Sequence, residues 1–342
     1  MAGTWGRYLR VSIFGESHGP AIGVTLDGLP AGLEIDMEEV ARHMARRAPG
    51  QGLTTTARKE PDAPQVLSGM YRGRLTGTPV CAVIENRDQH SQDYPQGMDM
   101  PRPGHADYTG HLRYFGFEDP RGGGHFSGRI TAPIVFAGSL VRQWLEGKGV
   151  SIAARPVRIG QAVELPGQGY NPQMEAEILA ARAQQDSVGG IIECVAAGLP
   201  AGLGAPFFDS AESLIAHLLF SVPGVKGVEF GLGFAMGRMR GSQVNDPMAM
   251  VQGKVVHLSN HSGGALGGIT NGEDLVFRAV MRPTASIAQP QRTVSLEKGE
   301  DAVLTIRGRH DPCIVMRALP VVESMAALAL GEMWKEREAC RA

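Results

Sequence analysis

The hexapeptide Gly-Leu-Pro-Ala-Gly-Leu occurs twice, at residues 28–33 and again at residues 198–203. In both places a run that predicts a β-strand precedes it and a run that predicts a helix follows it, and each helix leads into a Pro-Gly pair. A hexapeptide rich in glycine and proline can recur by chance, but matching context on both sides favours duplication. We therefore predict one domain, residues 1–342, built from two similar halves, about 1–170 and 171–342.

The order of the predicted strands and helices limits the fold class. Strands are predicted where Val- and Ile-rich runs are bounded by Gly, Pro, Asn or Asp, and helices where apolar residues recur every three or four positions. The order is mixed, unlike the regular alternation of a doubly wound sheet, so we predict an α+β fold with antiparallel sheets. One helix opens on Asp36-Met37-Glu38-Glu39, a D-x-x-E capping box. The predicted strands are 11–16, 22–26, 78–85, 150–159, 191–197, 274–281 and 303–307, and the predicted helices are 36–47, 133–146, 174–185, 211–220 and 320–338.

Charge and hydropathy exclude several classes of partner. The chain has 33 Lys+Arg against 35 Asp+Glu, so no basic field indicates a nucleic-acid partner. The longest apolar run, near residues 132–141, falls short of the roughly 20 residues that span a bilayer. No secretory signal opens the chain, and the four cysteines form no C-x-x-C pair, which fits reduced thiols. We expect a cytoplasmic protein without a membrane or nucleic-acid partner.

Residues 15–19, Gly-Glu-Ser-His-Gly, fit the G-x-S-x-G pattern of serine hydrolases. In those enzymes the serine stands between a strand and a helix. Here the segment after Ser17 predicts a second strand, so the context disfavours a nucleophilic serine. His18, next to it, is then the residue of interest.

Three further segments combine arginine with histidine, glycine or aspartate: residues 100–110, 118–132 and 307–313. Guanidinium groups bind phosphate and carboxylate in two-point contacts, and glycine-rich turns offer backbone N–H groups to anions. Two histidines, His18 and His105, can supply protons near neutral pH. The pattern predicts a site for an anionic ligand with acid–base chemistry.

Two other kinds of site compete with this interpretation. His105, Asp107 and His111 are ligand-like residue types, but their spacing matches no strong zinc signature and no cysteine joins them, so we expect no metal. Residues 231–237, Gly-Leu-Gly-Phe-Ala-Met-Gly, miss the dinucleotide-binding spacing by one residue and lack its strand–helix unit. No G-x-x-x-x-G-K-[ST] segment exists, which excludes a P-loop.

Taken together, many segments of the chain resemble the chorismate synthase family, and the resemblance runs almost from end to end. It implies a layered β-α-β sandwich, with helices between antiparallel sheets, assembled as a homotetramer. The segments that carry it are FGESHG, GLPAGL, ARRAPG, ARKEPD, IENRDQHSQDY, RPGHADYTG, DPRGGGHFSGR, VKGVEFG, SGGALGGITNG, RPTASI and GRHDPC.

The resemblance also implies the reaction. That family removes phosphate and a ring hydrogen from 5-enolpyruvylshikimate 3-phosphate by trans-1,4 elimination, giving chorismate for aromatic amino acid biosynthesis through the shikimate pathway. It requires reduced FMN, which donates charge as phosphate leaves and whose N5 accepts the ring proton. No nicotinamide-binding or reductase segment is visible, which favours an external flavin reductant, although use of NADPH by the chain itself stays open.

Residue roles follow from the same resemblance. His18 matches the histidine that protonates the departing phosphate, and His105 the one that protonates or electrostatically supports the reduced flavin. Asp311 matches the aspartate that relays the ring proton. The implied substrate-binding residues are Ser17, Arg47, Arg58, Arg102 and Arg129. The implied cofactor-binding residues are His125, Phe126, Ser127, Pro223, Gly224, Gly267, Arg282, Pro283, Thr284, Ala285, Ser286 and Arg309.

The chain departs from the family pattern at several anion-binding positions. His125 and Phe126 stand where many members have Arg-Ser, Leu53 replaces an arginine, and Arg282 replaces a lysine. A protonated His125 could replace the lost charge. Two alternatives to the enzyme remain open: a non-catalytic flavin-binding protein, and a serine hydrolase that uses Ser17.

Overall fold

Two antiparallel five-stranded sheets form the outer layers of the protein. The structure is a computed structural model, which describes residues 3–50, 62–87, 99–165, 169–306 and 310–340. The first sheet has the order β1 (Thr4–Trp5), β2 (Arg10–Gly15), β3 (Ala21–Asp27), β7 (Val80–Glu85), β4 (Gln65–Ser68). The second has the order β11 (Val225–Phe230), β16 (Leu275–Met281), β10 (Gly190–Ala197), β8 (Ser151–Ile159), β9 (Ala162–Val163).

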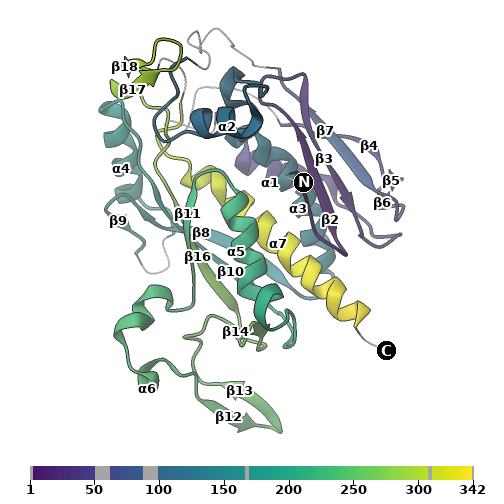
Figure 1. Cartoon of the computed structure of the whole chain (residues 1–342). Helices are drawn as coiled ribbons and strands as arrows, with labels where there is room; N and C mark the ends of the chain where they lie inside the picture. The colour runs from purple at the N-terminus through teal and green to yellow at the C-terminus, as the bar shows by residue number, and fades with distance from the viewer. Residues whose placement is uncertain (1–2, 51–61, 88–98, 166–168, 307–309, 341–342) are drawn as a thin grey trace.

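Helices fill the space between the sheets (Figure 1). They are α1 (Met37–Arg47), α3 (Thr131–Glu146), α5 (Ala211–Ser221) and α7 (Val315–Ala339). Helix α3 packs on β3 and β7, α7 packs on β8 and β10, and the two helices pack against each other. A Cβ built on Gly138 of α3 would lie 2.2 Å from Cβ of Ser324 on α7, so glycine permits this close approach. The predicted α+β sandwich is confirmed.

Shorter elements complete the described chain. Each predicted strand and helix has a counterpart, although α7 begins at Val315, before Pro320, where the helix was predicted to start. The sequence analysis missed α2 (Asp107–Tyr114), β11 and most short strands. The other elements are α4 (Pro172–Ala183), α6 (Gly241–Val244), β5 (Met70–Tyr71), β6 (Arg74–Leu75), β12 (Met248–Val251), β13 (Lys254–His257), β14 (Ala265–Leu266), β15 (Ile269–Thr270), β17 (Gln291–Ser295) and β18 (Glu300–Leu304).

The two copies of the hexapeptide occupy equivalent places in the two sheets. Each follows a central strand, and the neighbouring strands run β2-β3-β7-β4 in one sheet and β8-β10-β16-β11 in the other. The first glycine of each copy has positive φ, +103° for Gly28 and +78° for Gly198. A Cβ would lie 2.1 Å from the carbonyl oxygen of Tyr8 in the first case and 2.2 Å from that of Gly149 in the second. The division into two similar halves stays a prediction, which superposition of the halves would test.

Helix α1 begins with only part of the predicted capping box. The Asp36 carboxylate accepts hydrogen bonds from the N–H groups of Glu38 (2.8 Å) and Glu39 (3.1 Å), as an N-cap should. The Asp36 N–H donates to Oε1 of Gln143 on α3, at 2.8 Å, and not to the Glu39 side chain. The reciprocal half of the box was wrong, because the neighbouring helix supplies the acceptor.

A buried polar cluster lies where α1, α3 and α7 meet. Glu323 of α7 is buried and accepts from both terminal nitrogens of Arg46, at 2.7 and 2.9 Å, and from Arg142 at 3.3 Å. Arg142 also donates to Nε2 of His43, at 2.8 Å. Burial, with the nearby Arg142 charge, lowers the pKa of His43 to about 4.

Stability should therefore fall as the pH is lowered from about 6.5 to about 4. In that window the unfolded chain binds a proton at His43 and the native protein does not, so the free energy of unfolding decreases by about 1–3 kcal/mol from this group. Chemical denaturation across this range should give a shallower pH dependence for His43→Gln. Measurements at pH 7–8, where the group is neutral in both states, separate lost packing from titration. Equal slopes in the two proteins would contradict the prediction.

Within the described ranges, no helix combines the length and apolar character that a membrane span requires.

Candidate functional site

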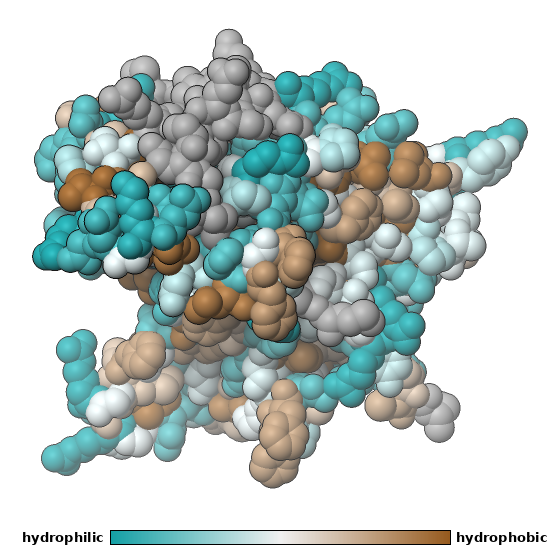
Figure 2. Space-filling view, turned by 45° about the horizontal axis from the view of Figure 1, so that its top comes forward, coloured by the Kyte–Doolittle hydropathy of each residue, from teal (hydrophilic) through white to brown (hydrophobic). Residues whose placement is uncertain are grey.

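Most of the predicted site residues come from loops at one end of the protein. The C-terminal end of α1, helix α2 and the start of α7 lie together there, at the top of Figure 1. Figure 2 turns this end forward and shows many hydrophilic residues around it, with hydrophobic ones between them. Arg58 and Arg309 lie outside the described residues.

A turn of three glycines brings His18 and His105 to the same place. Gly122, Gly123 and Gly124 have φ of +62°, +96° and +52°, a left-handed conformation that side chains rarely allow. A Cβ on Gly122 would lie 1.8 Å from Cε1 of His18, and one on Gly123 would lie 3.1 Å from Cε1 of His105. The two histidines therefore pack on consecutive residues of one backbone turn.

Ser17 supports His18 and does not form a nucleophile elbow. It lies between strands β2 and β3, so the predicted strand–turn–strand context is confirmed. Its hydroxyl lies 3.2 Å from Nδ1 of His18, and its N–H donates to the carbonyl of Gly124 at 3.1 Å. Both side chains are buried. The contacts hold the imidazole against the glycine turn.

His105 is held by Asp107 and Arg102. Asp107 accepts from Nδ1 of His105 at 2.6 Å, and from Nε and Nη2 of Arg102, both at 2.7 Å. Burial alone would raise the pKa of Asp107, but the hydrogen bonds from Arg102 and His105 hold that pKa well below its usual range. The carboxylate thus stays ionised and orients both partners.

The three residues of the metal-site alternative do not share one set of partners. His111 lies 3.1 Å from Oε1 of Glu118, on a different partner from His105. Nowhere in the described part of the chain do three His, Cys, Asp or Glu side chains converge as metal ligands.

Arg47 and Arg129, predicted to bind substrate, share a carboxylate that the sequence analysis missed. Asp62 forms an ion pair through Oδ2 with Nη1 of Arg47 and through Oδ1 with Nη1 of Arg129. All three residues are buried. Asp62 is the last residue of the segment ARKEPD. The resemblance drew attention to that segment, but no spacing rule drew attention to Asp62.

Asp311, predicted to relay a proton, also has an unforeseen partner. Arg317, in the first turn of α7, forms an ion pair with the Asp311 carboxylate, and its Nε donates to the carbonyl of Arg47 at 3.0 Å. Thr284 donates its hydroxyl hydrogen to the Asp311 carbonyl at 3.0 Å. Arg317 escaped notice because it precedes the residue at which the helix was predicted to begin.

The predicted cofactor loop, residues 282–286, contacts Gly104, Gly224 and Arg102. The Arg282 side chain donates to the carbonyl of Gly104, and its N–H donates to that of Gly224 at 2.9 Å. Ser286 is buried and accepts from Nη1 of Arg102 at 3.4 Å. Pro283 and Ala285 lie in the same loop, and Pro223 directly precedes Gly224.

The remaining cofactor candidates divide into two groups. Nδ1 of His125 donates to the carbonyl of Gly15 at 2.8 Å, Ser127 caps the N–H of Arg129 at 3.2 Å, and the Phe126 ring lies 6.1 Å from that of Tyr114. These three residues thus lie beside the histidine loops. Gly267, in the turn between β14 and β15, lies at the other end of the molecule (Figure 1). The chain does not bring Gly267 to the cluster.

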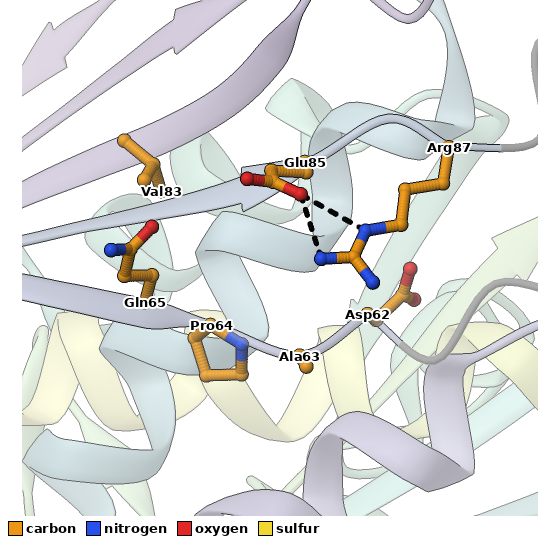
Figure 3. Close-up of a pocket in the computed structure, with 7 residues that line it drawn as sticks. All are labelled: Asp62, Ala63, Pro64, Gln65, Val83, Glu85 and Arg87. Carbon is orange, nitrogen blue, oxygen red and sulfur yellow. Dashed lines mark hydrogen bonds and ion pairs between the residues drawn. The ribbon is translucent and has the colours of Figure 1, made fainter.

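Figure 3 shows a surface hollow of about 330 Å³ beside Asp62. Among its described lining residues, only Asp62 belongs to the group of buried ion pairs with Arg47 and Arg129. Arg87 donates to Glu85 there at 2.9 Å. A second hollow, of about 370 Å³, lies between Trp5 and Glu336 and includes no predicted site residue among those described. Neither hollow contains His18, His105 or Asp311 among its described lining.

Comparisons with known proteins identify the family. The family model described as chorismate synthase matches residues 9–334. The chain is 48% identical to the chorismate synthase of Thermococcus kodakarensis, over 98% of each chain. It is 46% identical to that of Chitinophaga pinensis, over 96% of this chain and 95% of the other. A crystal structure of chorismate synthase superposes with a TM-score of 0.75 and 28% identity, covering 97% of this chain and 93% of the other. The chain therefore belongs to the chorismate synthase family of lyases.

Proposed function

We propose that the protein converts 5-enolpyruvylshikimate 3-phosphate to chorismate by trans-1,4 elimination of phosphate, with reduced FMN as cofactor. The observation that supports this most is the packing of two histidines on consecutive residues of a glycine turn, beside a buried Arg102. The reaction needs a proton for the departing phosphate and cations for a substrate with three anionic groups. Both kinds of residue converge at this end of the protein.

The arginines suit the anionic groups of the substrate. Arg47 ends helix α1, Arg102 lies in the loop before α2, and Arg129 lies in the 3₁₀ turn at residues 128–130; all three are buried. Guanidinium groups bind carboxylate and phosphate with two parallel hydrogen bonds, and burial strengthens that attraction. We assign them to the phosphate and the two carboxylates as a group.

The histidines supply the acid–base chemistry. His18, held by Ser17 and the Gly122 backbone, donates a proton to the departing phosphate oxygen in this proposal. His105, held by the ionised Asp107, would protonate the reduced cofactor or support it electrostatically. Asp311, held by Arg317, relays the proton that leaves the substrate ring.

The described cofactor residues fit FMN. Gly224 has φ of +96°, a conformation that suits glycine, and a Cβ built there would lie 3.0 Å from Cδ1 of the Ile314 side chain. Arg282, Thr284 and Ser286 place a cation and hydroxyl groups on the same loop, as a phosphate-bearing cofactor requires. When bound, reduced FMN would supply electron density to the site as phosphate departs. The residues that would hold FMN are His125–Ser127, Pro223–Gly224 and 282–286. In a single copy of the chain, Gly267 does not join them.

Replacement of Arg317 tests whether Asp311 must be held in place. For Arg317→Ala we expect kcat to fall about 10- to 100-fold, with KM within about threefold, because a displaced proton relay slows proton transfer without removing an anion contact. Arg337→Ala, near the other end of the same helix, is the matched control and should keep wild-type kcat. Equal kcat in both variants would remove Arg317 from the proposal.

Assembly and location are part of the same proposal. We propose a cytoplasmic homotetramer that receives its flavin electrons from an external reductant, with NADPH as the ultimate source. Exposed apolar side chains on and beside the β12–β13 hairpin, which projects from the body in Figure 1, support self-association. They include Met248, Met250, Val255 and Leu258.

An anaerobic assay tests the proposed reaction. The chain is mixed with 5-enolpyruvylshikimate 3-phosphate and chemically reduced FMN, and chorismate absorbance and released phosphate are followed together. Equal amounts of both products are expected. A flavin-binding protein without activity would bind FMN and release no phosphate, and a serine hydrolase would react with a fluorophosphonate at Ser17; either result would contradict the proposal.

A further inference from the structure

We propose that Asp62 is a positioning residue, which holds Arg47 and Arg129 in the geometry that receives an anionic group of the substrate. The inference rests on the proposed function, in which both arginines bind that substrate. Asp62 itself need not touch substrate. Its effect passes through the two guanidinium groups.

The three residues reach one point from separate parts of the chain. Arg47 ends helix α1, Arg129 lies in the 3₁₀ turn at residues 128–130, and Asp62 lies shortly before β4. The exposed fractions of the side chains are 0% for Asp62, 3% for Arg47 and 4% for Arg129. The carboxylate gives one oxygen to each arginine. Such a shared, fully buried contact fixes the two guanidinium groups relative to each other.

Neutral acceptors hold the outer edges of the two arginines. Nε and Nη2 of Arg47 donate to Thr131 Oγ1 and to the Gly128 carbonyl, both at 3.1 Å. Nε and Nη2 of Arg129 donate to Asn86 Oδ1 at 3.0 Å and to the Glu85 carbonyl at 3.2 Å. Of these described acceptors, Asp62 alone carries charge. The neutral ones orient each arginine singly, and Asp62 couples the pair.

Charge explains why a carboxylate is suited to this position. Two guanidinium groups side by side in a buried place repel each other strongly, because little water screens them. One carboxylate between them offsets that repulsion. Without it, the arginines would separate or draw in another anion.

The backbone at Asp62 is itself specialised. Asp62 has φ of +48°, a left-handed conformation that is uncommon outside glycine and more tolerated by Asp than by most residues. Pro64 follows, and then β4, which pairs with β7. Figure 3 shows Asp62 on the segment just before this strand. Strained backbone persists where surrounding structure holds it, which suits a side chain that must point to one place.

The effect on substrate affinity distinguishes a positioning carboxylate from one that merely occupies the anion site. A carboxylate that only fills the place of a missing substrate would leave when substrate binds, and its removal would tighten binding. A positioning carboxylate stays, and its removal weakens binding. The two roles therefore predict opposite changes in affinity.

The test compares Asp62→Asn with the wild-type chain. We expect the KM for 5-enolpyruvylshikimate 3-phosphate to rise about 10- to 100-fold, with a smaller change in kcat, since the chemistry residues remain. Asp62→Glu keeps the charge but moves it by one methylene, and KM should rise about three- to tenfold. This second variant answers the question even if the Asn variant does not fold. An unchanged or lower KM in a folded variant would overturn the inference.

Glu323→Gln is the matched control. Glu323 is also a buried carboxylate shared by two arginines, Arg46 and Arg142, but it contacts no predicted site residue. We expect the Glu323→Gln variant to be less stable than wild type, with KM within about threefold of the wild-type value. A KM rise equal to that of Asp62→Asn would reduce Asp62 to a stability role.

Binding of inorganic phosphate by calorimetry, without flavin or substrate, separates this inference from the proposed function. If wild type makes no chorismate but Asp62→Asn still weakens phosphate binding at least tenfold, the proposed function fails and the role of Asp62 stands. If wild type makes chorismate and Asp62→Asn binds phosphate and substrate as wild type does, Asp62 loses its role and the function stands.

Discussion

Alanine in place of His18 or His105 should lower turnover by about 10²- to 10⁴-fold, the usual loss when a positioned acid–base group is removed. His18 is buried against Gly122 and Ser17, which hold its ring in one position. His105 is hydrogen-bonded to the ionised Asp107. In His105→Ala the charge of Asp107 would remain, without the hydrogen bond from the imidazole. Rates are measured anaerobically with chemically reduced FMN in excess, so that weakened cofactor binding does not mask the result.

His111→Ala is the control for this pair. His111 lies on α2, close in sequence to His105, but it contacts Glu118 instead of the cluster. Its turnover should stay within about twofold of wild type. Near-normal turnover in both His18→Ala and His105→Ala would remove the assigned roles. A large loss in His111→Ala would show that damage to α2, and not acid–base chemistry, accounts for the His105 result.

Gly122→Ala should reduce turnover about as much as the loss of His18 itself. The added Cβ would lie 1.8 Å from Cε1 and 2.0 Å from Nδ1 of the His18 ring, so the imidazole must leave its position. The backbone φ of +62° adds strain for any residue other than glycine. A shift of about 1 Å in a reacting group can cost about 10²-fold in rate.

Gly128→Ala, six residues along the same segment, is the matched control. Its Cβ would meet no atom of the described residues within 4 Å, and its φ is not in the left-handed region. This variant should keep wild-type turnover and stability. Circular dichroism establishes that Gly122→Ala is folded, and kcat is then compared. Full activity in folded Gly122→Ala would contradict the assignment of His18 as proton donor.

Local pattern was enough to predict the elements that carry the core. The strands before each copy of the hexapeptide and the helices after it were expected at nearly their observed bounds, because hydrophobic periodicity reports which face is buried. Helix α2 was missed. Its eight residues include Gly110, and its N-cap residue, Ala106, makes no side-chain cap. Packing of Gly110 against the Phe126 ring, which leaves no room for a Cβ, favours the helix there.

The candidate site shows the same division. Motif and resemblance singled out His18, His105, Asp311 and the arginines. They did not show that Asp62 joins Arg47 to Arg129, or that Arg317 holds Asp311. These partners are separated along the chain by residues with no periodic relation, so no local pattern marks them.

The sequence by itself determined the class of fold, the family and the residue types that could carry proton transfer and anion binding. Periodicity and short turns depend on neighbours in the chain, which a sequence displays directly. Only the tertiary structure decided that His18 and His105 share one glycine turn, that Gly267 lies far from them, and that a buried carboxylate joins two arginines. Ion pairs and close packing depend on distance in space, and burial sets their strength. Distances in space and burial are set only in the folded protein, where the two sheets pack against the helices.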